Sequence, residues 1–200
     1  MPSKQRLKQT ADGISLMAFF TFLWALLAEI ALQPRDHYML GVFFGVIVVL
    51  LITYYVKFNN AQRKLPEPPE PPAGKDTPKK TQDKRLIIFV GLEAAAIVVI
   101  KNVFANTGLD DYFIPCFALI VGLHFFPLGK LFNRSFDYYM GAWTCLVALA
   151  GIVLTHQDAW PVYLITTLVA GGCGLATSIY GVMMILRGHK IAYDTSISIH

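Results

Sequence analysis

The chain has 200 residues, of which 55% are hydrophobic and only 15% are charged. Soluble globular domains carry about 25% charged residues, so this composition argues against a soluble globular protein. The formal net charge of +4 and the mean hydropathy of +0.51 are averages that include a proline-rich stretch without apolar content. The composition therefore predicts an integral membrane protein.

Six apolar stretches are each long enough to cross a hydrocarbon layer of about 30 Å as a helix. They are Gly13 to Leu32, Tyr38 to Val56, Leu86 to Asn106, Tyr112 to Gly129, Tyr138 to His156 and Trp160 to Leu186. The first apolar run exceeds the 7 to 15 residues of a signal peptide, so we interpret it as an uncleaved helix. The predicted fold class is an all-α, polytopic membrane helical bundle with six transmembrane helices.

The distribution of Lys and Arg predicts the orientation of these spans. With the N-terminus in the cytoplasm, 15 of the 17 cations fall in inner segments, whereas Arg35 lies in an outer loop and Lys101 lies within a helix. The positive-inside rule therefore predicts that both termini are cytoplasmic. The cations form no compact patch beside stacking aromatic residues, so no nucleic-acid partner is expected.

The chain order suggests four parts. They are an N-terminal two-helix hairpin (1–58), a Pro/Lys-rich cytoplasmic linker (59–85), a four-helix transmembrane unit (86–190) and a C-terminal tail (191–200). Six of the 11 prolines lie between Pro66 and Pro78, which favours an extended polyproline spacer. A docking site for a cytoplasmic partner is the alternative role of this linker.

Four ionisable residues lie within the predicted spans: Glu29, Glu93, Lys101 and His124. Such residues are costly in a bilayer and usually face the bundle interior or water. At a rise of about 1.5 Å per residue, Glu29 and Lys101 lie about 24 Å and about 22 Å above the inner edge. The two could form an outer ion pair, or each could reach the outer surface by snorkelling.

Glu93 and His124 form a second set at a different depth. The same counting puts them about 10 Å and about 12 Å above the inner edge, on consecutive spans joined by a short loop. A carboxylate beside an imidazole is a competent proton relay, since histidine titrates near physiological pH. The alternative is a buried polar contact that only fixes helix packing.

The three cysteines carry little signal. Cys145 and Cys173 fall near the same depth as Glu93 and His124, but no C-x-x-C or H-x-x-x-H spacing accompanies them. Buried cysteine commonly serves as a small hydrophobic residue. We therefore predict no metal site, no cofactor and no disulfide framework.

The last span carries a face of small residues: Ala170, Gly171, Gly172, Gly174 and Ser178. Small residues let another helix approach closely in lipid. Packing within the chain and a homo-oligomer seam through this sixth helix are the two interpretations. Near the end of the fourth span, Pro127 is expected to bend or end the helix just after His124.

A short element in spans four and five resembles a known group of sequences. Gly122-Leu123-His124-Phe125-Phe126-Pro127-Leu128-Gly129, followed by Phe132 and by Tyr138-Tyr139-Met140-Gly141, is similar to a G-x-H-F-x-P-L element of uncharacterised small bacterial multi-pass membrane proteins. The resemblance covers about a fifth of the chain. It implies a bacterial inner membrane and importance for His124 and Pro127, and it implies no activity.

Enzyme motifs such as G-x-S-x-G, H-E-x-x-H, a P-loop or a nucleotide-binding G-x-G-x-x-G are absent from the sequence. The leading hypothesis is a small transporter or permease-like protein for protons or a small solute, with Glu93 and His124 as the central pair and Glu29 and Lys101 as an outer pair. The alternative is a non-catalytic membrane accessory or assembly protein that acts through helix packing and the proline-rich linker. An intramembrane enzyme is the third and least favoured hypothesis.

Overall fold

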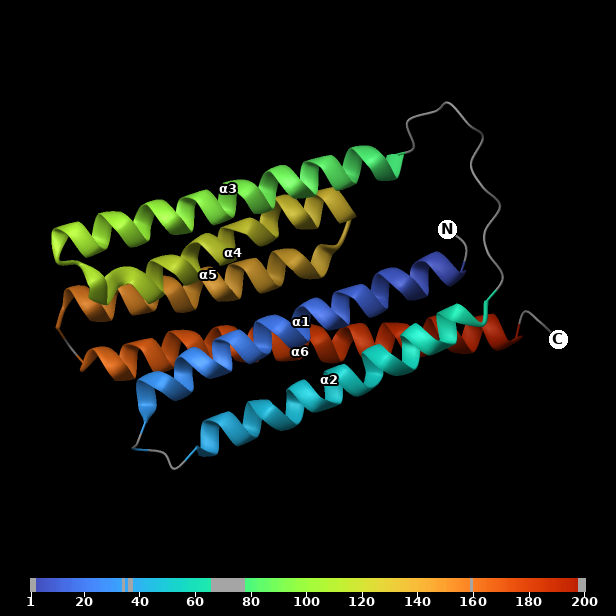
Figure 1. The fold of residues 1–200 in the computed structure, drawn as a ribbon, viewed down its shortest axis with the longest axis horizontal. Coiled ribbons are helices and arrows are strands. Elements are labelled where there is room, and N and C mark those ends of the chain that lie inside the picture. The colour runs from blue at the N-terminus through green and yellow to red at the C-terminus, as the bar shows by residue number, and fades with distance from the viewer. Residues whose placement is uncertain (1–2, 34, 36–37, 66–77, 159, 198–200) are drawn as a thin grey trace. The chain divides into compact units, whose positions relative to one another are not determined.

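The computed structural model describes residues 3–33, 35, 38–65, 78–158 and 160–197. All regular secondary structure in these residues is helical (Figure 1). The helices are α1 (Ser3–Leu32), α2 (Met39–Arg63), α3 (Pro78–Thr107), α4 (Phe113–Phe132), α5 (Ser135–His156) and α6 (Val162–Ile197), with a short 3₁₀ helix η1 (Asp110–Tyr112) before α4. The predicted all-α fold is confirmed for the described part of the chain.

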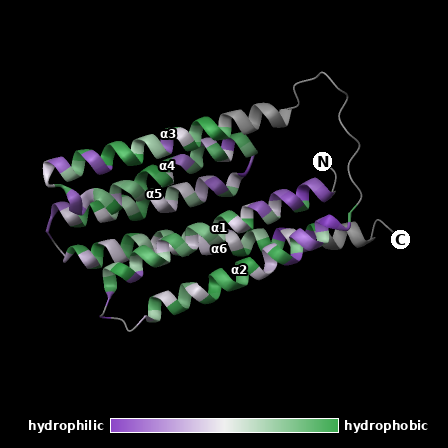
Figure 2. Ribbon diagram, viewed as in Figure 1, coloured by the Kyte–Doolittle hydropathy of each residue, from purple (hydrophilic) through white to green (hydrophobic). Residues whose placement is uncertain are grey.

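Each of the six long helices contains a segment long and apolar enough to cross a membrane. Figure 2 shows apolar residues along most of their length and hydrophilic residues in the first turns of α1 and the last turns of α2. The six segments overlap the six predicted spans. In α3, α4 and α5 the ends differ by at most three residues, and in α1, α2 and α6 the apolar segment extends at least five residues beyond the predicted span at one end. Six such helices are compatible with a multi-pass integral membrane protein.

The helices extend into the segments expected to be linker and tail. α2 continues to Arg63, α3 begins at Pro78 and α6 continues to Ile197. Proline is tolerated in the first turn of a helix because its missing N–H has no helical partner there. The flanks of the predicted 59–85 linker and most of the predicted 191–200 tail are therefore helical, while the proline-rich residues 66–77 lie outside the described residues.

Contacts divide the chain into two compact units. Unit 1 comprises Met1–Leu26, Asp36–Glu70 and Gly174–His200, and unit 2 comprises Leu27–Arg35 and Pro71–Cys173. The division expected from the sequence follows chain order, whereas the contacts group the second part of α6 with the first two helices. Helices α1 and α6 each contribute one part to either unit.

In unit 1, α1 packs through a seven-residue repeat. Six of its buried residues follow spacings of four and three, and Met17 and Trp24 are buried next to them: Leu7, Ala11, Ile14, Ala18, Thr21 and Ala25. This spacing is typical of left-handed coiled coils, and the small side chains let a neighbouring helix approach closely. On α6, Met184 fills the space beside Gly13, and the Thr21 hydroxyl donates a 2.9 Å hydrogen bond to Thr177.

A second seven-residue repeat joins α2 to α6. Phe44, Leu51 and Phe58 are buried on α2, and each lies against one of the glycines Gly174, Gly181 and Gly188 on α6. A Cβ added at Gly174 would lie 3.0 Å from the Phe44 ring, and one at Gly181 would lie 2.5 Å from Leu51 Cδ2. Large side chains of α2 thus occupy the spaces left by glycines of α6, which sets the register of the two helices.

In unit 2, α4 and α5 make the most extensive contact, and α3 packs on α4. The backbones of α4 and α5 approach closely where two glycines face each other. A Cβ added at Gly141 would lie 2.9 Å from the carbonyl oxygen of Gly122, and a Cβ at Gly122 would lie 2.7 Å from Cys145 Sγ. Neither position leaves room for a side chain, so α4 is held firmly against α5.

Candidate intramembrane site

The side chains of Glu93 on α3 and His124 on α4 are in contact within unit 2. His124 Nδ1 lies 3.2 Å from Glu93 Oε2, and the two side chains are 13% and 15% exposed, respectively. The structure therefore brings together the two residues that depth counting placed at one level. Most of each side chain is shielded by the protein, as expected for ionisable groups in a membrane span.

The connection between the two helices sets this register. α3 ends at Thr107, and Gly108 has φ +71, a left-handed conformation that glycine adopts without steric cost. Glu93 lies about 10 Å along α3 from Leu86, and His124 lies about 12 Å along α4 from Phe132. A tight turn between antiparallel helices thus places both residues near the same height in the hydrocarbon layer.

His124 also lies two residues from Gly122, where α4 comes close to α5. A Cβ added at Gly122 would lie 2.9 Å from the backbone nitrogen of Cys145. Because the backbones here cannot move without disrupting the packing of both helices, the backbone of α4 next to His124 is held in a fixed position. The site thus comprises a firmly held imidazole on α4 and a carboxylate on α3.

Pro127 lies inside α4, which continues to Phe132. The proline therefore does not end the helix after His124. Proline has no backbone N–H, so the carbonyl of Leu123 loses its helical donor. This leaves a backbone acceptor next to His124 in sequence, and a bend at this point stays a prediction.

The outer pair is arranged differently. Glu29 is buried, with 8% of its surface exposed, whereas Lys101 is exposed. No ion pair joins these two residues, both of which the structure describes. Lys101 lies about 9 Å along α3 from Thr107, within reach of the outer edge for a snorkelling side chain. The structure therefore does not bring the expected outer pair together.

The small-residue face of α6 is divided between the two units. In unit 2, Ala170 is buried and a Cβ added at Gly172 would lie 2.8 Å from Val147. In unit 1, Gly174 contacts Phe44, and the hydroxyl of the buried Ser178 donates to the Gly174 carbonyl at 2.7 Å. A Cβ at Gly171 would meet nothing within 4 Å. These positions, Gly171 apart, are used for packing within the chain.

Two features escaped the sequence reasoning. Asp137, which the sequence analysis did not single out, is buried in the first turn of α5. Its burial could have been found from the spacing of Asp137, Gly141 and Thr144, which puts small and polar residues on one face of α5. The second is the seven-residue glycine repeat of α6. Gly181 and Gly188 follow Gly174 at intervals of seven residues, and this spacing can be found in the sequence.

No group of three or more His, Cys, Asp or Glu side chains within the described ranges could hold a metal ion. Cys116, Cys145 and Cys173, all of which the structure describes, form no disulfide bond. Cys145 packs its sulfur against Gly122, as a small apolar side chain would.

Comparisons of the chain with models of protein families, with curated proteins and with solved structures find no match. The resemblance of the His124 element to small bacterial membrane proteins accordingly stays a prediction.

Proposed function

We propose that both termini of the chain are cytoplasmic and that it resides in a bacterial inner membrane. The support for this orientation is the distribution of cations, 15 of 17 of which fall in the segments assigned to the inner side. The described residues of unit 1 follow the same pattern, since α2 carries no charged residue from Met39 to Val56 and three cations from Lys57 to Lys64.

Cysteine labelling in intact cells tests this orientation. Asp158→Cys should react with a membrane-impermeant maleimide, and Lys64→Cys should react only after the cells are permeabilised. Wild-type protein, with its three native cysteines, sets the background. The reverse pattern of labelling would overturn the proposed orientation.

We propose that the protein conducts protons, alone or coupled to a small solute, through the Glu93 and His124 pair. The observation that supports this function is the 3.2 Å contact between His124 Nδ1 and Glu93 Oε2 inside apolar helices. Ionisable residues are rare in transmembrane segments and commonly mark proton or ion pathways.

The geometry allows a proton to pass from His124 to Glu93 and the pair to return to its starting state. A proton arriving at His124 Nε2 produces an imidazolium, which the adjacent Glu93 carboxylate stabilises. The proton on Nδ1 then passes to Oε2, leaving a neutral imidazole and a neutral carboxylic acid. Release of the proton from Glu93 and a return of the imidazole to its first tautomer complete the cycle.

The alternative is a membrane accessory or assembly protein in which the pair is a structural contact that holds α3 against α4. The exposure of α3 favours this possibility, because Ile87, Leu92 and Val98 are each more than half exposed. Such a helix shares little apolar surface with the rest of unit 2, so a polar contact would add to its attachment.

Proton flux into proteoliposomes separates the two functions. Under a potassium diffusion potential, Glu93→Gln and His124→Gln should each abolish uptake reported by an entrapped pH-sensitive dye. His156→Gln, which removes an exposed imidazole at the end of α5, is the matched control and should leave uptake unchanged.

The folded state of each variant must be measured beside its flux. If transport is the function, Glu93→Gln should retain the helix content and elution volume of the wild type while flux is lost. Full flux in both variants, or loss of flux only in proportion to loss of folded protein, would contradict proton conduction. Either result would favour a structural contact between α3 and α4.

A further inference from the structure

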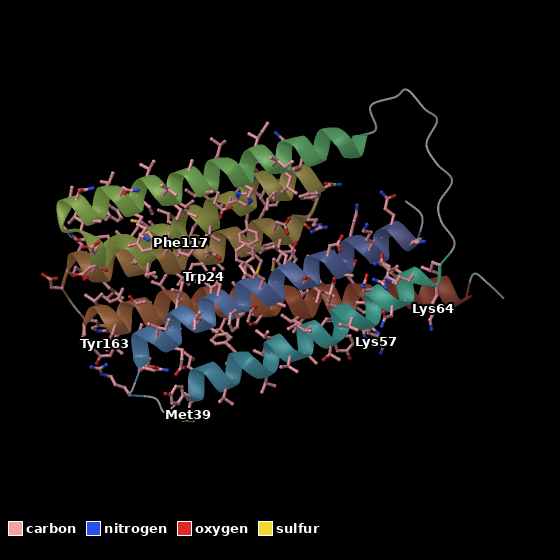
Figure 3. All side chains as sticks on the ribbon, in the orientation of Figure 1. Trp24, Met39, Lys57, Lys64, Phe117 and Tyr163 are labelled. Carbon is pink, nitrogen blue, oxygen red and sulfur yellow. The ribbon has the colours of Figure 1, made fainter. Side chains whose placement is uncertain are left out.

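Three helix ends meet at one end of unit 1. Gly188 on α6 contacts the Phe58 ring on α2, and Gly13 on α1 contacts Met184 on α6. These contacts put the first turns of α1 beside the last turns of α2 and the later turns of α6. Figure 3 shows Lys57 and Lys64 towards this end of α2, and Met39 at its other end.

This end of unit 1 is strongly basic. Seven Lys and Arg side chains are exposed on it: Arg6, Lys8, Lys57, Arg63, Lys64, Arg187 and Lys190. Among the described side chains of the same turns, Asp12 is the one acidic residue. The other turns of unit 1 carry no charge, from Gly13 to Leu26 and from Gly174 to Leu186. We call these seven residues the cationic end.

The cationic end lies at the depth of lipid headgroups. A hydrocarbon layer of about 30 Å takes about 20 residues of helix, so α2 would leave the layer near Phe58 if it enters at Met39. Lys64 then lies about 9 Å below this edge, within or just beyond a headgroup layer of about 5 to 8 Å. Leu7 and Phe58 are buried, so the helices remain packed together through this layer.

A cluster of aromatic and cationic side chains lies within the cationic end, between α2 and α6. The imidazole of His189 packs edge-on against two rings, with centroids 5.3 Å from Tyr54 and 5.4 Å from Phe58. Lys57 Nζ lies 5.5 Å from the centroid of the Tyr54 ring. The Lys57 ammonium and the exposed His189 imidazole are thus both held beside Tyr54, next to the exposed Lys190.

We propose that this cluster binds the phosphate of an anionic phospholipid in the cytoplasmic leaflet. Lys57 and His189 supply N–H donors, Tyr54 supplies a hydroxyl, and Lys190 adds charge. Tyrosine suits this depth because its ring is apolar and its hydroxyl is polar. A lipid fits better than an acidic protein, because the donors lie at the edge of the hydrocarbon layer. The remaining cations of the cationic end come from α1, α2 and α6 and would also face lipid headgroups.

The test measures lipid selectivity of the whole protein in phosphatidylcholine nanodiscs, using spin-labelled phosphatidylglycerol and spin-labelled phosphatidylcholine. Wild-type protein should immobilise phosphatidylglycerol preferentially, and Lys57→Gln should lower that preference about tenfold, as expected for the loss of one hydrogen bond between two charged groups. His189→Gln should also lower it. Lys57→Arg, which keeps the charge, should retain most of it.

A matched control distinguishes a site from overall charge. Lys130→Gln removes an exposed cation from α4 in unit 2 and should leave the preference unchanged. An equal loss in Lys130→Gln, or no loss in Lys57→Gln, would overturn the proposal. Displacement of phosphatidylglycerol by added inorganic phosphate would show a site for free anions and would also overturn it. Proton flux is a separate readout, so failure of the proton pathway leaves this test intact.

Discussion

Unit 1 and unit 2 both pack their helices through small residues, but they contain different polar groups. In unit 1 a buried, neutral hydrogen bond joins α1 to α6, from the Thr21 hydroxyl to Thr177, and the charged residues of the described turns lie at the helix ends. In unit 2 a carboxylate and an imidazole meet within the apolar part of α3 and α4. The two units therefore share the way their helices pack and differ in the charges they hold.

The difference bears on why Glu93 and His124 are present. Lipid tails are as apolar as the helices, so association in a membrane depends on close packing and polar contacts. Unit 1 packs through glycines and hydroxyls, and its apolar turns (13–26, 39–56 and 174–186) contain no Asp, Glu, Lys, Arg or His. Since helices of this chain can pack in that way, the costly ionisable pair of unit 2 favours a role beyond packing.

The largest expected effect concerns the contact that supports the site in unit 2. Gly122→Ala would put a Cβ 2.9 Å from the backbone nitrogen of Cys145, and backbone cannot yield as a side chain can. We expect a loss of about 2 to 3 kcal/mol in the free energy of unfolding, measured by denaturant titration in mixed micelles. Gly171→Ala, which meets nothing, is the control, and equal stability of the two variants would contradict the close approach of α4 to α5.

A smaller loss is expected at the corresponding contact of unit 1. Gly188→Ala would collide with the Phe58 ring, which can move further than backbone atoms. We expect a cost of about 1 to 2 kcal/mol in the same titration. Phe58→Leu in the Gly188→Ala background should recover part of it, and Gly45→Ala, on an open face of α2, should cost nothing. Failure of the second substitution to rescue would contradict the proposed register.

The Glu93 and His124 contact should contribute less to stability than either glycine contact. Polar contacts between transmembrane helices contribute on average about 0.6 kcal/mol and at most about 1.7 kcal/mol. A double-mutant cycle of Glu93→Gln and His124→Gln should therefore give a coupling energy of about 1 kcal/mol. A much larger coupling energy would indicate that the pair mainly stabilises the fold. It would contradict the inference that the ionisable pair of unit 2 has a role beyond helix packing.

The smallest effect is expected for the neutral contact of unit 1. Thr21→Val should cost about 0.6 kcal/mol, because the Thr177 hydroxyl still donates its own hydrogen bond to the Gly174 carbonyl at 3.0 Å. Thr53→Val is the control, since the Thr53 hydroxyl is exposed and donates within its own helix to Val49. If Thr21→Val proves as costly as Gly188→Ala, hydrogen bonding and not glycine packing holds unit 1 together.

Hydropathy and helical rise were enough to predict the six spans and the common level of Glu93 and His124. The same counting predicted Glu29 and Lys101 at one level, yet Lys101 is exposed and Glu29 is buried. Depth along a helix follows from residue number, whereas the direction in which a side chain points depends on which faces of the helices meet. For Glu93 and His124, the short turn at Gly108 makes α3 and α4 neighbours, and no such local constraint links α1 to α3.

The grouping of α6 with α1 and α2 could be predicted only in part. The seven-residue spacing of Gly174, Gly181 and Gly188 can be found in the sequence, as can that of Phe44, Leu51 and Phe58 on α2. That the two repeats face each other is a tertiary fact, since α2 and α6 are separated by three other helices along the chain. Sequence order therefore suggested a division after the second span, while packing follows the matching repeats.

The most direct test of the central claim compares proton flux in four proteins: the wild type, Glu93→Gln, His124→Gln and the variant with both substitutions. Groups that act as one relay are not additive, so either single substitution should remove as much flux as the two together. We predict equal, near-complete loss of flux in all three variants, with unfolding free energies within about 1 kcal/mol of the wild type. Independent, multiplying losses, or flux that survives in the double variant, would contradict a proton pathway through this pair.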